Sequence, residues 1–168
     1  MPVIFKGDEK IAYRDPACYY YNGEYHLFFT FSEKKNGYMY NRVGHSRSSD
    51  LRVFSEPELI TVKDYAWNYC SPGNVVKYGD EYLICVTSYP MKVPYSEKSC
   101  ADETARLFFI KTKDFKSFSS PERIYPKGRE NTNEGRMIDP FVFEKAKGEF
   151  LLFFKQNGVS VSRSTNLC

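Results

Sequence analysis

The chain has 168 residues, a formal net charge of +3 from 24 basic and 21 acidic residues, and 17% aromatic residues. This length suffices for one domain with a hydrophobic core. The charge is scattered and almost balanced, which argues against a nucleic acid or a membrane surface as the partner. No apolar run approaches the length of a membrane span, and the first ten residues lack the apolar segment of a signal peptide.

The cysteines argue against a metal site. Cys18, Cys70, Cys85, Cys100 and Cys168 include no Cys-x-x-Cys pair, and their number is odd. This pattern fits neither a zinc site nor a disulfide framework and predicts a reducing, cytoplasmic setting. The sequence also contains no glycine-rich phosphate loop and no carboxylate-rich calcium loop, so we expect neither a cofactor nor a metal.

The first structural unit opens with Asp15-Pro16 and continues into a β-hairpin. Asn22-Gly23 lies between two aromatic-rich runs, residues 19–21 and 25–31. Asn-Gly is the strongest short-range hairpin signal, because both residues tolerate a positive φ. Further strands of this unit are expected over residues 40–46 and 58–62.

The same order of features returns twice along the chain. The second unit begins at Ser71-Pro72 and turns at Gly79-Asp80, and the third begins at Asp139-Pro140 and turns at Lys147-Gly148. Each turn again separates two strand-like runs rich in aromatic and aliphatic residues. The strands expected in these units span residues 74–78, 82–88, 105–112 and 122–125, then 141–144, 150–155 and 158–162.

A second repeated phrase closes the third strand of each unit. It consists of Ser or Thr, then Asp or Asn two residues later, then an apolar residue, at 48–51, 112–115 and 164–167. Whole sheets that repeat in this way are typical of radial all-β architectures. We therefore predict an all-β chain, a β-propeller of four-stranded antiparallel blades, with blade 1 over about 10–62, blade 2 over about 66–126 and an unfinished blade 3 over about 136–168.

Two acids stand at the same position of two repeats. Asp15 precedes Pro16 and Asp139 precedes Pro140, each directly before the first strand of a sheet. For a single Asp-Pro, a turn acid that bonds its own backbone is the commoner explanation, and proline pushes the residue before it towards extended or turn geometry. The repeated position favours a site instead, because the starts of the innermost strands of a radial array converge on one axis.

A pair of carboxylates matches the chemistry of glycosidic-bond cleavage. One carboxylate activates water or attacks the sugar, and another acid donates a proton to the leaving oxygen. Arg14 and Arg136 lie close to Asp15 and Asp139 in the sequence. They are expected either to act as charge partners of these acids or to form surface ion pairs that contribute little.

Polar and aromatic residues near the repeated phrases are further candidates for sugar binding. Trp67 is predicted on a loop ahead of the second unit, where its ring either stacks on a sugar face or anchors the loop. Ser71, Asn74, Gln156 and Asn157 have side chains that can hydrogen-bond sugar hydroxyls if they face the site. For each of the four alone, structural capping is the commoner role.

The two histidines are predicted to be structural. His26 and His45 lie in strand-like segments. Neither has a Ser or Cys neighbour in a triad-like context, so a role within the sheet is favoured for both.

Four motifs give the chain a specific resemblance. They are Arg14-Asp15-Pro16, the segment 69–76 (Tyr-Cys-Ser-Pro-Gly-Asn-Val-Val), the segment 135–140 (Gly-Arg-Met-Ile-Asp-Pro) and the segment 155–160 (Lys-Gln-Asn-Gly-Val-Ser). Their order and spacing resemble those of glycoside hydrolase family 43, and also those of the related family 32 invertase-type enzymes, across nearly the whole chain. The resemblance implies a five-bladed β-propeller with a funnel-shaped sugar site on its axis, of which this chain holds about three blades.

The resemblance also implies roles for the two acids. Asp15 matches the general base, and Asp139 matches the acid that tunes and orients the proton donor. That donor is a Glu at the start of a fourth blade, a position that lies beyond this chain. The glutamates Glu130, Glu134, Glu144 and Glu149 lie before or within the third unit and do not match it by position.

These expectations define one main hypothesis and three alternatives. The main hypothesis is an inverting glycosidase that acts on plant-type oligo- or polysaccharides, so the expected partner is an oligosaccharide or glycoside. The alternatives are a non-catalytic carbohydrate-binding module, a structural propeller fragment and a glycoside phosphorylase. A third blade without a neighbour would expose an apolar face and an unpaired edge, so we also expect self-association or marginal stability.

Overall fold

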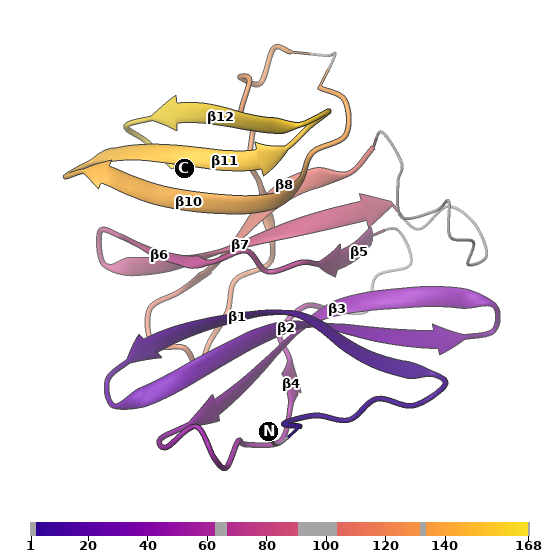
Figure 1. Ribbon diagram of the computed structural model, residues 1–168. Coiled ribbons are helices and arrows are strands. Elements are labelled where there is room, and N and C mark those ends of the chain that lie inside the picture. The colour runs from indigo at the N-terminus through magenta and orange to yellow at the C-terminus, as the bar shows by residue number, and fades with distance from the viewer. Residues whose placement is uncertain (1–2, 63–66, 91–103, 132–133, 168) are drawn as a thin grey trace.

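The computed structural model describes residues 3–62, 67–90, 104–131 and 134–167, and these residues form three antiparallel β-sheets that lie one above another (Figure 1). The first sheet, at the N-terminus, has the strand order β1-β2-β3-β4, and the third has the order β10-β11-β12. The sheet between them has the order β5-β7-β8-β9, with β6 also paired to β7. The predicted all-β class is confirmed. Within the described residues, no helix is long and apolar enough to cross a membrane.

The strands follow the chain order of the repeats, and each sheet is an antiparallel meander, except that β5 and β6 both pair with β7 and not with each other. The bounds are β1 Ile11–Tyr21, β2 Glu24–Lys35, β3 Tyr38–Ser48, β4 Glu58–Leu59, β5 Trp67–Cys70, β6 Val75–Tyr78, β7 Glu81–Pro90, β8 Arg106–Thr112, β9 Glu122–Arg123, β10 Ile138–Ala146, β11 Glu149–Lys155 and β12 Val159–Ser164.

Left-handed residues close the hairpins. Asn22 and Gly23 have φ of 48° and 87° between β1 and β2, and Asn36 and Gly37 have φ of 53° and 77° between β2 and β3. A positive φ at both central residues belongs to the type I′ turn, whose twist matches that of the paired strands. The Asn-Gly pairs therefore favour these hairpins because their own residues adopt the positive φ angles that the turn requires.

The second repeated phrase folds into the same turn in the first two sheets. Oγ of Ser48 accepts the backbone N–H of Leu51 at 2.9 Å, and Oγ1 of Thr112 accepts that of Phe115 at 2.9 Å. Leu51 and Phe115 have φ of 60° and 56°. Side-chain hydroxyls that bond nearby backbone N–H groups stabilise such turns. Phe115 is buried between the first two sheets, and its ring centroid lies 4.4 Å from that of His26.

The middle sheet is buried on both faces. In β7, Tyr82, Ile84 and Val86 pack against the first sheet, and Leu83 and Cys85 pack against the third. Successive side chains of a strand point to opposite faces, so this position between two layers explains why β7 is apolar without alternation. The core of the described chain consists of two apolar layers, one on each side of this sheet.

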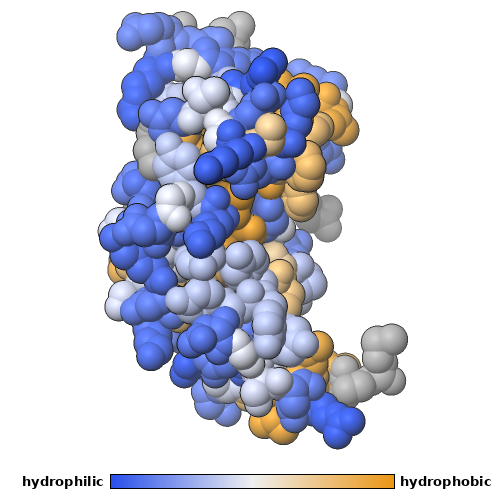
Figure 2. Space-filling view, turned by 90° about the vertical axis from the view of Figure 1, so that its left-hand side faces the viewer, coloured by the Kyte–Doolittle hydropathy of each residue, from blue (hydrophilic) through white to orange (hydrophobic). Residues whose placement is uncertain are grey.

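The third sheet is buried on one face only. Phe150, Leu152 and Phe154 belong to the apolar layer shared with the middle sheet. Phe141 and Phe143, on the opposite face, are 49% and 50% exposed. In Figure 2 apolar surface is visible at one side of the upper part of the molecule, where the third sheet lies, and further apolar areas appear in the middle and at the lower end of this view.

Two details differ from the sequence prediction. The inner strand of the middle sheet is divided into β5 and β6, so Trp67 is the first residue of a strand and does not lie on a loop. The inner strands of the first and third sheets begin before their Asp-Pro pairs and continue through them. Proline is tolerated at these points because each strand bulges there.

Candidate functional site

Asp15 and Asp139 lie on equivalent bulges of the innermost strands. β1 loses its register with β2 at Asp15-Pro16, and β10 loses its register with β11 at Asp139-Pro140. Both aspartates have a φ of 54°, which is the left-handed region that Asp tolerates better than most residues. Neither aspartate has the extended geometry expected before proline, and each instead takes a left-handed conformation at a bulge within its strand. A bulge re-aims its side chain, and both aspartates are exposed.

A buried hydroxyl holds the Asp15 carboxylate. Thr30 of β2 is fully buried and donates its Oγ1–H to Oδ2 of Asp15 at 2.7 Å. The same Oγ1 accepts the backbone N–H of Ser71 at 2.7 Å, and Oγ of Ser71 lies 3.4 Å from Oδ2 of Asp15. Ser71 is also left-handed, with a φ of 48°. The carboxylate is therefore oriented by groups from two sheets.

The middle and third sheets meet in a related way. Thr87 of β7, which stands where Thr30 stands in the first repeat, accepts the backbone N–H of Asp139 at 3.1 Å. A Cβ atom on Gly73 would lie 1.6 Å from the carbonyl oxygen of Pro140, so only glycine fits between these two segments. The three repeated X-Pro segments consequently lie next to one another in sequence order.

The two arginines do not pair with the acids beside them in the way that the sequence suggested. Nη2 of Arg14 donates to Oγ of Ser32 at 2.9 Å, and no ion pair joins Arg14 to Asp15. Arg14 and Asp15 thus bond different hydroxyl groups of β2, those of Ser32 and Thr30. Arg136 is half-buried, two residues before β10 begins.

Two of the predicted sugar ligands are engaged with the backbone. Oδ1 of Asn74 accepts the N–H of Val142 at 2.9 Å, and its Nδ2 donates to the C=O of Val142 at 2.8 Å. Asn74 thus clamps the middle sheet to the third. Gln156 donates from Nε2 to the carbonyl oxygen of Glu134. These contacts correspond to the structural alternative that the sequence left open.

Asn157 and Trp67, two further predicted ligands, differ in exposure. Asn157 is exposed in the turn between β11 and β12, with a φ of 50°. The Trp67 ring is half-buried and makes an edge contact with Phe108, at 6.0 Å between ring centroids. Trp67 therefore packs on the apolar layer between the first two sheets.

Sequence reasoning missed the two threonines that organise the site. Thr30 of β2 and Thr87 of β7 are fully buried. They occupy the same position when the repeats are superimposed, since each pairs with the residue just before an X-Pro segment, and Lys155 takes that position in the third repeat. A threonine at the same position of the first two repeats was the signal available in the sequence.

The two histidines form a buried pair away from the acids. Nδ1 of His26 lies 3.0 Å from Nε2 of His45, and the rings are nearly parallel at 8°. Burial lowers the pKa of both side chains, and it lowers the pKa of His45 to about 3 with help from the neighbouring His26 and Arg47. His45 is therefore neutral at neutral pH and packs among aromatic rings, as expected of a structural residue.

The fold and the site define a class of protein. The three antiparallel meanders are stacked, and their innermost strands bring the repeated X-Pro segments next to one another. This arrangement is that of the blades of a β-propeller. The family model described as the glycosyl hydrolases family 32 N-terminal domain matches residues 12–166. The chain therefore belongs to this family. The family 32 part of the predicted resemblance is confirmed, and a specific assignment to family 43 is not.

Solved structures of glycosidases share the fold. A glycosyl hydrolase from Bacteroides ovatus superimposes with a TM-score of 0.68 at 18% identity, over 92% of this chain and 46% of that chain. A family 32 β-fructofuranosidase from Bombyx mori gives 0.60 at 19%, over 92% and 33%. An exo-inulinase from Aspergillus awamori gives 0.66 at 19%, over 95% and 36%. These similarities confirm the predicted propeller fold.

The chain spans less than half the length of these three structures. At such identities the likeness concerns the fold alone. No curated protein matches the chain.

Proposed function

We propose that this chain supplies the base-bearing part of a glycosidase site, with Asp15 as the residue that polarises a water molecule at the anomeric carbon. The observation that carries the proposal is the fixed position of the Asp15 carboxylate. It is exposed, it stands on a bulge, and Oγ1 of Thr30 holds one of its oxygens at 2.7 Å. A carboxylate that is held at one oxygen and reachable from solvent suits a general base.

Asp139 is proposed as the orienting acid of the same site. It occupies the repeat-equivalent bulge and has the same φ as Asp15. Its segment contacts the Ser71-Pro72-Gly73 segment through Gly73, and that segment in turn contacts Asp15 through Ser71. The three X-Pro segments therefore form one row, with Asp15 and Asp139 at its two ends. A sugar bound over this row would contact both carboxylates.

The proposed chemistry is inverting hydrolysis of plant-type oligo- or polysaccharides. Asp15 takes a proton from water as the water attacks, and a Glu of a further blade protonates the leaving oxygen. In that arrangement the two carboxyls stand roughly 6.5–9.5 Å apart, against about 5–5.5 Å for a retaining pair. The anomeric form of the first product, read by NMR in a protein that contains all the blades, distinguishes the two outcomes.

Binding to this chain alone is the direct test. Calorimetry with arabino-, xylo- and fructo-oligosaccharides should find at least one ligand. Asp15→Asn should weaken it by about tenfold, which corresponds to one lost charge-assisted hydrogen bond. Asp80→Asn is the matched control, because Asp80 is an exposed hairpin acid paired only with Lys113 among the described residues. The proposal is contradicted if none of the oligosaccharides binds, or if Asp15→Asn and Asp80→Asn lose the same amount of affinity.

The same panel separates the other functions. Binding in a protein with all blades but without turnover identifies a carbohydrate-binding module. Turnover that requires inorganic phosphate identifies a phosphorylase, and a mannoside phosphorylase family that also contains glycoside hydrolases is among the structural neighbours, with a TM-score of 0.69 at 16% identity.

We also propose that the protein works in a reducing, cytoplasmic setting. The described residues contain no disulfide. Cys85 is completely buried, and burial raises the pKa of its thiol to about 12, so it acts as a small apolar side chain. Cys100 and Cys168 lie outside the described residues. Thiol counting on protein taken from cells under native redox conditions tests this, because a pair of oxidised cysteines would contradict it.

A further inference from the structure

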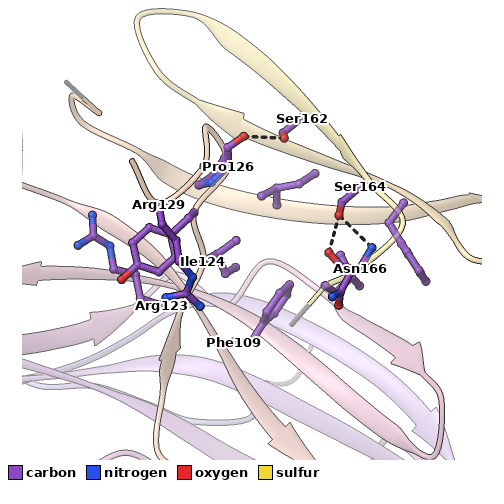
Figure 3. A pocket seen from close by; sticks show the side chains of 13 residues that line it. Phe109, Arg123, Ile124, Pro126, Arg129, Ser162, Ser164 and Asn166 are labelled. Carbon is purple, nitrogen blue, oxygen red and sulfur yellow. Dashed lines mark hydrogen bonds between the residues drawn. The ribbon is translucent and has the colours of Figure 1, made fainter. Parts of the chain in front are cut away.

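A cavity of about 220 Å³ lies between the middle and third sheets, apart from the acids (Figure 3). Its apolar lining includes Phe109 of β8, Ile124 just after β9 and Leu152 of β11. None of its lining residues belongs to the three X-Pro segments. Pockets for drug-sized ligands have about 300–1,000 Å³, so this volume suits a ligand with a single ring.

Positive charge gathers at the mouth of this cavity. Arg123 and Arg129 both line it, and their guanidinium carbons lie 4.8 Å and 4.5 Å from the centroid of the Tyr125 ring. Tyr125 also lines the cavity and thereby fixes both cations beside it. Figure 3 shows Arg123 and Arg129 on the same side of the cavity, opposite Ser164 and Asn166.

Among the described residues, the two arginines that line the cavity differ in their acidic partners. Glu134 is buried and accepts from both Arg106, at 2.8 Å, and Arg123. The Glu134 carboxylate thus engages Arg123, one of the two cations that line the cavity. Arg129 is exposed, and within the described ranges it forms no ion pair with a carboxylate.

Arg129 therefore lacks an anionic partner among the described residues. A carboxylate at the cavity mouth would supply one, with the guanidinium group of Arg123 beside it.

From these observations we propose that the cavity is a binding site for a small organic anion that carries an apolar ring, such as an aromatic carboxylate. The ring fills the apolar part formed by Phe109, Ile124 and Leu152. The carboxylate lies at the mouth between Arg123 and Arg129. This site is independent of the proposed sugar site, because the two share no residue.

The test titrates the whole chain with three probes and follows backbone amides by NMR. Benzoate carries both features, benzyl alcohol carries only the ring and acetate only the charge. Benzoate should bind saturably, shift the amides of Ile124, Gly128 and Ser162, and bind about tenfold more tightly than either of the other probes. Absence of saturable binding, shifts confined to other regions, or equal affinity for benzyl alcohol overturns the proposal.

Two variants test whether the positive charge at the cavity mouth binds the carboxylate of benzoate. Arg129→Gln removes an exposed guanidinium without touching the Glu134 ion pairs and should weaken benzoate by about tenfold. Arg52→Gln changes an exposed cation between β3 and β4 of the first sheet, carries the same change in net charge and should leave the affinity unchanged. Equal effects of the two variants would show nonspecific attraction to a basic protein and would refute the site.

Discussion

The middle and third sheets have similar strands in different surroundings. β7 of the middle sheet and β11 of the third are both nearly continuous apolar runs. Leu83 of β7 is fully buried, whereas its repeat equivalent in β11, Leu151, is only half-buried. The sequence of β11 therefore has the composition of a strand covered on both faces, but in the described structure only one face is covered.

The comparison shows that the apolar composition of β11 is that of a strand able to pack on both of its faces. An apolar run without alternation is a property of strands between two layers. The open face of the third sheet carries Phe141, Phe153 and Val161 in direct register across its three strands. Such a row on a surface is a mark of an interaction site.

The largest effect is expected from a matched pair of leucines. Leu83→Ala should lower the free energy of unfolding by about 2–5 kcal/mol, because it leaves a cavity in a fully buried layer. Leu151→Ala makes the same change at the half-covered position and should cost about 1 kcal/mol or less. Urea unfolding of both variants measures the difference. Equal losses would mean that the open face is covered in solution.

The next effect concerns the contact between the first and middle sheets at the site. Thr30→Val removes the acceptor of the Ser71 N–H and the donor to Asp15. Leaving a buried N–H without a partner should cost about 1–3 kcal/mol. Thr30→Ser keeps the hydroxyl and should recover most of that loss in thermal unfolding. A serine variant as unstable as the valine variant would assign the effect to packing of the methyl group.

A pH effect should arise at the interface between the first and middle sheets. The pKa of His45 is lowered to about 3 in the folded chain, against 6.5 as its ordinary value. Between these values the unfolded chain binds more protons, so stability falls as the pH is lowered from 6.5 towards 3. The loss attributable to His45 should reach about 2 kcal/mol at pH 5.

His45→Gln provides the control for this pH effect. The variant has no imidazole at that position, so its unfolding free energy should depend less steeply on pH between 6.5 and 5 than that of the parent chain. The interface between the middle and third sheets contains neither of the two histidines. Identical slopes for the parent and the variant would contradict the assignment to His45.

The smallest effect on folding is expected at the open face, where we propose contact between copies of the chain. Phe153 is 36% exposed at the centre of its apolar row. Phe153→Lys should change the free energy of unfolding by less than about 1 kcal/mol but should reduce association at high concentration. Sedimentation velocity over a range of concentrations measures this. A parent chain that remains monomeric throughout would contradict the proposal.

Local signals in the sequence determined much of the fold. Asn22-Gly23 and the apolar runs beside it predicted a hairpin, because the φ preferences of a turn depend on its own residues. The threefold return of X-Pro, hairpin and turn phrase predicted repeated sheets. The family resemblance rested on the same motifs and was confirmed for family 32, while the roles of Asp15 and Asp139 stay predictions.

Only the tertiary structure decided how the repeats meet. Thr30 bonds Ser71, 41 residues away, and Asn74 bonds Val142, 68 residues away. Contacts between sheets depend on how the blades stack, which no local preference encodes. For the same reason the sequence did not show that Arg14 turns from Asp15 to Ser32, or that β7 and β11, so alike in composition, differ in what covers them.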